Sequence, residues 1–337
     1  MTILSNIRSG SRGHFRRAGR ARLGRTIPRI AALTAWMLAI GGCVAPTGPA
    51  TVRLYDTHAH FFTADTARYP LDVRGAREGE DQLRARIAAS PNTPETVLPV
   101  WKANGVAGGV AVQYAEAYKS DNRFVLDSGD RFPAKIAVVV ILDPLSPGSP
   151  AELRRLAREH GVRGVRITGR PDAGGTYGWI DTPSAQALWR VADELKLAVV
   201  IMTLPAELSP SALTRIATLA GRFPNARVVL DHIGWAKPGE DLNALHAAIG
   251  NRRNVYLKLT TVNLELLERA SDDSAGYVRR VVDLFGARRV MWGSDFGRSA
   301  LSFDRMVHRL EAAEARLTPG EKRQLMYETG HRVFHRK

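Results

Sequence analysis

Ile136-Ala-Val-Val-Val-Ile-Leu142 is the stretch that decides the fold, because an unbroken apolar run of this length fits a strand buried on both faces. Ala198-Val-Val-Ile201 is a second run of the same kind. An antiparallel sheet with one solvated face would show apolar and polar residues in alternation. Both runs therefore predict a parallel sheet that is covered by helices.

Similar runs rich in β-branched residues recur along the chain, and helical patterns separate most of them. The predicted strands are 52–58, 106–112, 136–142, 162–167, 197–203, 226–231, 254–259 and 289–293. The predicted helices are 94–104, 150–160, 183–195, 209–222, 241–250 and 273–286. Eight strands that alternate with helices predict an α/β protein with one closed (β/α)8 TIM barrel rather than an open sheet. No glycine-rich phosphate loop opens a helix, which argues against a dinucleotide-binding fold.

The N-terminus reads as a bacterial export signal. An Arg-rich stretch leads into the apolar run Ile30–Ile40, which is too short to span a bilayer comfortably. The run ends in Gly41-Gly42-Cys43, which resembles the lipobox of lipoproteins, and Cys43 is the single cysteine of the chain. We predict a lipoprotein-type signal peptide at 1–42, a tether at 43–51 and the barrel at 52–337. An ordinary signal peptide with an incidental cysteine is the alternative.

The predicted signal segment also accounts for half of the basic charge. The formal net charge is +15, and residues 1–42 hold eight arginines, no lysine and no acid. Without them the chain holds 40 basic and 33 acidic side chains, so its net charge falls to +7. A nucleic-acid binder should keep its basic excess on the folded body, so no nucleic-acid partner is expected. We expect an exported protein on the periplasmic side of the cell envelope, anchored to a membrane through a lipid at Cys43.

The first strand ends in Asp56-Thr57-His58-Ala59-His60. Residues two apart in a strand point to the same side, so His58 and His60 should both project into the barrel mouth, with Asp56 on the same face beneath them. Two imidazoles on one strand can grip a metal ion, and Asp56 could orient one of them. Packed polar residues at a strand end are the alternative.

Two further candidates follow the last and the sixth strands. Asp295 comes after the apolar run 289–293, where its carboxylate could bind a metal or take a proton from an attacking water. His232 comes after the sixth strand, and it could polarise a carbonyl or bind a metal. Loop capping by Asp295 and a structural role for His232 are the alternatives.

Three residues are candidates for substrate binding. Arg166 lies near the end of the fourth strand, and its guanidinium could hold a carboxylate in a bidentate pair. Lys258 lies in the seventh strand, where a buried cation needs a partner, either structural or a substrate. Tyr114 opens the connection 113–135, which we expect, like the connection 61–93, to be a long irregular loop over the site.

Five short motifs, spread over residues 52–335 in the same order, resemble the amidohydrolase superfamily. The similarity is to the branch of 2-pyrone-4,6-dicarboxylate lactonases, fuconolactonase-like hydrolases and related decarboxylases. The motifs are Asp56–His60, Gly161–Arg166, Asp231–Gly234, Tyr256–Thr260 and Val290–Asp295.

The resemblance implies a hydrolytic site of His58, His60, His232 and Asp295, with Arg166 near the substrate. It also implies one divalent ion, most often zinc, on His58, His60 and Asp295, although the dicarboxylate lactonases of this branch work without a metal. Metal-binding members place a histidine at the end of the fifth strand, where this chain has Met202 and Thr203.

The function expected from these residues is opening of a lactone of a small carboxylate or sugar acid, with Asp295 as the general base that deprotonates water. Two alternatives stay open. One is metal-dependent, non-oxidative decarboxylation of an aromatic acid in the same barrel. The other is a catalytically degenerate lipoprotein that only binds a ligand, which the altered fifth strand favours.

Overall fold

The computed structural model describes residues 53–335, and within them it forms the predicted barrel. The predicted signal peptide, Cys43 and the tether lie outside the described residues. No helix among residues 53–335 is both long enough and apolar enough to cross a membrane.

Eight parallel strands follow one another around the barrel in sequence order. Their bounds are β1 Leu54–Ala59, β2 Val106–Val112, β3 Ile136–Ile141, β4 Gly164–Gly169, β5 Ala198–Thr203, β6 Arg227–Leu230, β7 Val255–Thr260 and β8 Val290–Gly293. All eight predicted strands are present.

The barrel closes where the last strand meets the first. The amide of Asp295 donates to His58 O at 2.7 Å, and the amide of His60 donates to Phe296 O at 2.8 Å. The Thr57 hydroxyl adds a hydrogen bond to Trp292 O at 2.6 Å. This seam brings the residues that follow β8 against those that end β1.

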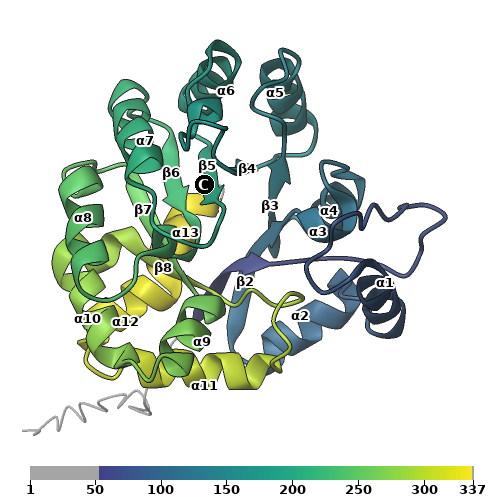
Figure 1. Cartoon of the computed structure of the whole chain (residues 1–337). Coiled ribbons are helices and arrows are strands. Elements are labelled where there is room, and N and C mark those ends of the chain that lie inside the picture. Colours follow the sequence, from purple (N-terminus) through teal and green to yellow (C-terminus); the bar gives the residue numbers. More distant parts are fainter. Residues whose placement is uncertain (1–52, 336–337) are drawn as a thin grey trace, which may run out of the picture. The chain divides into compact units, whose positions relative to one another are not determined.

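Helices surround the strands (Figure 1). Those that correspond to predicted helices are α2 Pro94–Ala103, α5 Ser149–Glu159, α6 Pro183–Glu194, α7 Pro210–Arg222, α8 Glu240–Ile249 and α10 Ser274–Phe285. Further helices are α1 Glu80–Ala89, α3 Ala115–Tyr118, α4 Arg123–Arg131, α9 Thr261–Arg269, α11 Phe303–Ala313, α12 Pro319–Arg323 and α13 Thr329–Phe334.

The long connections are more regular than predicted, because α1 lies within 61–93 and α3 and α4 lie within 113–135. Helix α4 was not predicted because it contains Ser128 and Gly129, and both residue types have a low helix propensity. The structure explains Gly129: a Cβ at this position would lie 2.3 Å from Val138 Cγ2. Close packing of α4 against β3 therefore outweighs the local preference.

The apolar core has two layers. The larger cluster lies between the strands and the surrounding helices and includes Trp101 and Trp189. The smaller cluster joins inward-facing strand residues such as Val110 and Val200 to Phe334 of α13. Phe334 of α13 therefore packs against the apolar interior of the barrel.

Candidate active site

Three ligand atoms converge where β1 and β8 end. His58 Nε2 lies 3.5 Å from Asp295 Oδ1, and His60 Nε2 lies 3.3 Å from the same oxygen. The two Nε2 atoms are 3.2 Å apart. All three side chains are almost fully buried, with exposed fractions of 0%, 4% and 3%. The predicted meeting of the first and last strands is therefore present in the structure.

The backbone carbonyl of Val112 orients the imidazole of His60. His60 Nδ1 lies 2.9 Å from Val112 O, which can only accept, so a neutral His60 carries its proton on Nδ1. Its Nε2 then turns a lone pair toward the Asp295 carboxylate. Two acceptors this close repel each other unless a proton or a metal ion lies between them.

Tyr114, the predicted substrate contact, packs on the other face of the site. Its ring stacks on His60 with centroids 4.8 Å apart and an interplanar angle of 28°. Its hydroxyl accepts a hydrogen bond from Arg86 Nη2 at 2.8 Å. Arg86, in α1, also donates to Gly297 O at 2.8 Å, so it ties the first connection to the segment after β8. In this structure Tyr114 contacts protein groups and supports His60.

Asp295 sits in a strained backbone position, with φ of 58°. A positive φ is uncommon for a residue other than glycine, and such positions concentrate at functional sites. Burial by itself raises the pKa of Asp295, but a hydrogen bond from His60, which needs a proton on Nε2, and the nearby His58 outweigh burial and hold that pKa below the usual range. Asp295 is therefore ionised at neutral pH and can accept a proton.

Asp231 forms the centre of a buried charge cluster beneath the histidines. Its Oδ1 lies 2.8 Å from Lys258 Nζ and 3.6 Å from His58 Nδ1, and its Oδ2 accepts from Arg166 Nε at 2.9 Å. Burial alone would raise the pKa of Asp231, but Lys258 and Arg166 lower it well below the usual range. Asp231 lies within the motif Asp231–Gly234, but its role could not be predicted, since nothing in the local sequence shows which cations surround it.

Lys258 and Arg166 are less free to bind substrate than predicted. Lys258 is fully buried, and its partner is structural: the ammonium pairs with Asp231 and lies over the Phe334 ring at 5.7 Å. Arg166 is 4% exposed and already uses Nε for Asp231. The substrate-binding assignment of Lys258 is therefore revised, because a buried ammonium with an anionic partner faces no open space.

Met202, near the end of β5, contacts Arg166. Arg166 Nη2 lies 3.0 Å from the Met202 sulfur. The next residue, Thr203, uses its backbone carbonyl to accept from the Trp235 indole at 2.8 Å. The fifth strand thus positions the guanidinium and adds no imidazole to the site.

His232 lies beside His58, with ring centroids 5.5 Å apart, and stacks on Trp235 at 4.3 Å. Its Nδ1 is 2.7 Å from the Thr260 hydroxyl, which in turn donates to Asn263 Oδ1 at 3.2 Å. His232 Nδ1 must therefore donate to Thr260, which leaves Nε2 as an acceptor. Burial lowers the pKa of His232 to about 4, so the ring is neutral at pH 7. A neutral ring with an acceptor Nε2 suits binding a cation better than donating to a carbonyl.

Asp56 does not orient an imidazole, which corrects the expectation from strand alternation. Its carboxylate accepts from the Ser294 amide at 2.8 Å, the Ser294 hydroxyl at 2.6 Å and the His58 amide at 3.0 Å. These three donors occupy the Asp56 carboxylate, and none of them is an imidazole nitrogen. Asp56 instead joins β1 to β8 directly below the site, and Ser294 was missed as its partner.

The donors suit a divalent cation. His58, His60 and Asp295 form a potential metal site in which the ligand atoms lie within 4.8 Å of one another. Three nitrogen and oxygen ligands with an open position are typical of catalytic metal sites. The facing lone pairs of His60 and Asp295 give an independent reason for a cation at this place.

Comparison with known proteins identifies the class. The sequence profile of the amidohydrolases matches residues 55–336, so the chain belongs to the amidohydrolase family and is a hydrolase. Among curated relatives, the L-fucono-1,5-lactonase of Burkholderia ambifaria is 31% identical over 220 residues, which cover 62% of this chain and 71% of that protein.

Solved structures share the fold at lower identity. A probable 2-pyrone-4,6-dicarboxylic acid hydrolase from Acinetobacter baumannii, with citric acid bound, has a TM-score of 0.63 at 17% identity, over 84% of this chain and 99% of that chain. A zinc-bound amidohydrolase from Burkholderia multivorans has a TM-score of 0.61 at 23% identity, over 83% and 98%. A manganese complex of 5-carboxyvanillate decarboxylase from Novosphingobium aromaticivorans has a TM-score of 0.61 at 15% identity, over 84% and 96%.

Proposed function

We propose that the protein hydrolyses a lactone of a small carboxylate or sugar acid. The observation that carries the proposal is the convergence of His58 Nε2, His60 Nε2 and Asp295 Oδ1 within hydrogen-bond range. The 31% identity to a fuconolactonase supports the lactone class, because this relative's name states such a substrate.

Asp295 acts as the general base in this proposal. Its ionised carboxylate takes a proton from a water molecule, and the resulting hydroxide attacks the lactone carbonyl carbon. When the tetrahedral intermediate collapses, the ring C–O bond breaks and the leaving alkoxide takes the proton back from Asp295. The product is the open-chain hydroxy acid.

The chain would hold a divalent ion, with zinc the first candidate, through His58, His60 and Asp295. When bound, such an ion polarises the carbonyl and lowers the pKa of water. Val112 O and Tyr114 hold the His60 ring for this role, and Asp231 lies at His58 Nδ1. His232, with its acceptor Nε2, lies next to this set.

Arg166 is the proposed clamp for a substrate carboxylate. Its Nε is occupied by Asp231, and its Nη2 makes only a thioether contact with Met202, which is a weak acceptor. A substrate carboxylate is a stronger acceptor than the Met202 sulfur and could replace that sulfur as the partner of Arg166 Nη2.

Met202→Leu should therefore raise KM only slightly, whereas Arg166→Met should strongly raise KM for lactones that carry a carboxylate.

The first test uses the purified full chain and a panel of lactones that includes L-fucono-1,5-lactone, with acid release as the readout. Asp295→Asn should reduce kcat by about 10²–10⁴-fold, the usual contribution of a general base. Asp304→Asn is the matched control, because Asp304 is an exposed acid on α11. Turnover by Asp295→Asn at the parent rate would remove Asp295 as the base, and binding without turnover by the parent would favour the ligand-binding alternative.

Metal content is the second test. The proposal expects about one divalent ion per chain by elemental analysis, with loss of that ion in a His58→Asn/His60→Asn double variant. A chelator should remove activity, and added zinc should restore it. Full activity in a metal-free preparation would limit the mechanism to the side chains alone.

Decarboxylation of an aromatic acid is the second candidate function. A manganese-bound 5-carboxyvanillate decarboxylase shares the fold, and His58, His60 and Asp295 could hold such an ion. This candidate requires carbon dioxide release from an aromatic acid and strict metal dependence. Lactone hydrolysis without carbon dioxide release would exclude it for the substrates tested.

A further inference from the structure

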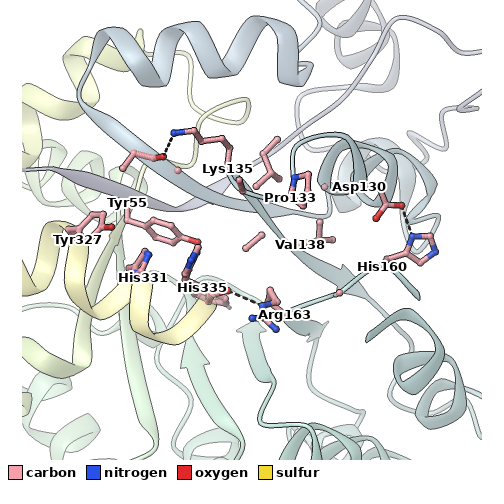
Figure 2. A pocket seen from close by; sticks show the side chains of 18 of the residues that line it. Tyr55, Asp130, Pro133, Lys135, Val138, His160, Arg163, Tyr327, His331 and His335 are labelled. Atoms are coloured by element: carbon pink, nitrogen blue, oxygen red, sulfur yellow. Dashed lines mark hydrogen bonds and ion pairs between the residues drawn. The ribbon is translucent and has the colours of Figure 1, made fainter. Parts of the chain in front are cut away.

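A cavity of about 430 Å³ lies at the N-terminal ends of the strands (Figure 2). His58 and His60 lie where β1 ends, at the other end of the barrel. Tyr55 of β1, Ile136 of β3 and Arg163, just before β4, contribute to its walls. Tyr327, which precedes α13, and His331 and His335 from α13 and its end close another side. Catalytic residues of such barrels lie at the C-terminal ends of the strands, so this cavity is separate from the candidate active site.

The charges around the cavity are predominantly positive. Arg53, Lys135 and Arg163 line it, together with His331 and His335. Arg163 Nε is anchored by the carbonyl of Phe334 at 3.1 Å, which holds the side chain against the barrel end. Lys135 Nζ contacts Ala107 O at 3.1 Å.

The acids that line this cavity already have basic partners. Asp130 Oδ2 lies 2.6 Å from His160 Nδ1, and Glu159 accepts from Arg158 at 2.8 Å and from Arg155 at 2.6 Å. Figure 2 shows Asp130 and His160 together at the side remote from Tyr55. Among the described lining residues, Arg53 and Lys135 therefore supply positive charge that these acids do not neutralise.

Flat rings form the wall next to these cations. His331 stacks on His335 at 4.2 Å and on Tyr327 at 5.0 Å, each with an interplanar angle of 18°. Tyr55 meets His331 edge-on at 5.5 Å. Burial, His335 and Arg53 lower the pKa of His331, as expected for an imidazole in a positive environment. These rings therefore give the cavity a flat wall next to Arg53 and Lys135.

We propose that this cavity binds a small anion that carries a phosphate or carboxylate group. Guanidinium and ammonium groups make the strong charge-assisted hydrogen bonds that such groups accept. The volume falls in the range of small-molecule sites. The anion could be a free metabolite or the headgroup of an anionic phospholipid, since both present the same oxygens.

The experiment titrates inorganic phosphate into the purified full chain, followed by calorimetry and thermal unfolding. Phosphate should raise Tm more than chloride of equal ionic strength does. Lys135→Met should weaken phosphate binding at least tenfold. His331→Phe, which keeps a stacking ring but removes the imidazole N–H that can donate to phosphate, should weaken it as well. Lys237→Met removes the same charge beyond β6 at the other end of the barrel and should bind like the parent.

A second arm separates the two sources. Co-sedimentation with phosphatidylglycerol vesicles, but not phosphatidylcholine vesicles, that is lost in Lys135→Met and competed by phosphate would identify a headgroup site. Phosphate binding without such sedimentation would identify a free anion. Equal effects of phosphate and chloride, or unchanged phosphate binding in both Lys135→Met and His331→Phe, would overturn the proposal.

Discussion

At the scale of single residues, the buried carboxylate of Asp231 holds two cationic side chains and one histidine in place. It pairs with Lys258 and Arg166 and lies at His58 Nδ1, and both Asp231 and Lys258 have no exposed surface. Two buried cations without this anion would face each other in a medium of low dielectric constant. A buried ion pair adds little stability over apolar packing, but removing one partner is costly.

We therefore predict that Asp231→Asn lowers the free energy of unfolding by about 3–5 kcal/mol, because it leaves Lys258 and Arg166 uncompensated. Urea unfolding measures the loss. In the background of Lys258→Met, which removes one of the two cations, Asp231→Asn should cost markedly less. Equal costs in both backgrounds would show that the pair is not coupled.

Tyr114 provides a second prediction at this scale, because its ring and its hydroxyl have different partners. Tyr114→Phe keeps the stack on His60 and loses only the hydrogen bond from Arg86. Tyr114→Ala loses both. Groups that support a metal ligand typically contribute 10–100-fold to metal affinity. We expect Tyr114→Ala to weaken zinc binding by about tenfold and Tyr114→Phe by much less, measured by competition with a chromogenic chelator. Equal affinities in the two variants would contradict a role for the stack.

At the scale of elements, the seam between β1 and β8 depends on small residues. A Cβ at Gly293 would lie 2.6 Å from His58 Cβ, so only glycine lets β8 approach the histidine strand this closely. Below the seam, α13 packs against the same strand, and a Cβ at Gly330 would lie 2.3 Å from Thr57 Cγ2. The two glycines thus set the spacing between β1 and its neighbours.

This spacing predicts that Gly330→Ala destabilises the protein by about 1–3 kcal/mol, the usual cost of overpacking, although alanine is the better helix former. Thermal unfolding measures the effect. The double variant Gly330→Ala/Thr57→Ser should recover most of it, since serine lacks Cγ2 but keeps the hydroxyl that bonds Trp292 O. If Thr57→Ser gives no recovery in the Gly330→Ala background, the clash is not with the Thr57 methyl group.

At the scale of the whole molecule, the two ends of the barrel carry two different candidate sites. The candidate active site lies where the strands end, and the basic cavity lies where they begin. The inner cluster with Phe334 fills the interior between them. Apolar packing therefore lies between the candidate active site and the basic cavity.

For the whole chain we further propose that residues 1–42 direct export and that Cys43 carries a lipid. A tagged full-length chain expressed in a Gram-negative host should then fractionate with membranes and incorporate labelled palmitate. Cys43→Ser should abolish the label, because it is the single cysteine of the chain. Labelling of Cys43→Ser, or a soluble unlabelled parent protein, would contradict the lipid anchor.

The sequence by itself determined the barrel and the meeting of its first and last strands at His58, His60 and Asp295. A buried parallel strand appears in the sequence as a short apolar run, and an amphipathic helix appears as apolar residues repeated every three to four positions. Both patterns can be recognised without knowing the distant residues that pack against them. His58, His60 and Asp295 could be predicted together because closure of a barrel forces its first and last strands to be neighbours.

Only the tertiary structure decided which partners meet across the barrel. The pairing of Lys258 with Asp231, the anchoring of Asp56 by Ser294 and the stacking of Tyr114 on His60 join residues that are far apart in sequence. The irregular register after Asp56 and the left-handed backbone of Asp295 leave no pattern in neighbouring residues. Such contacts depend on three-dimensional packing, about which local periodicity and propensity carry no information.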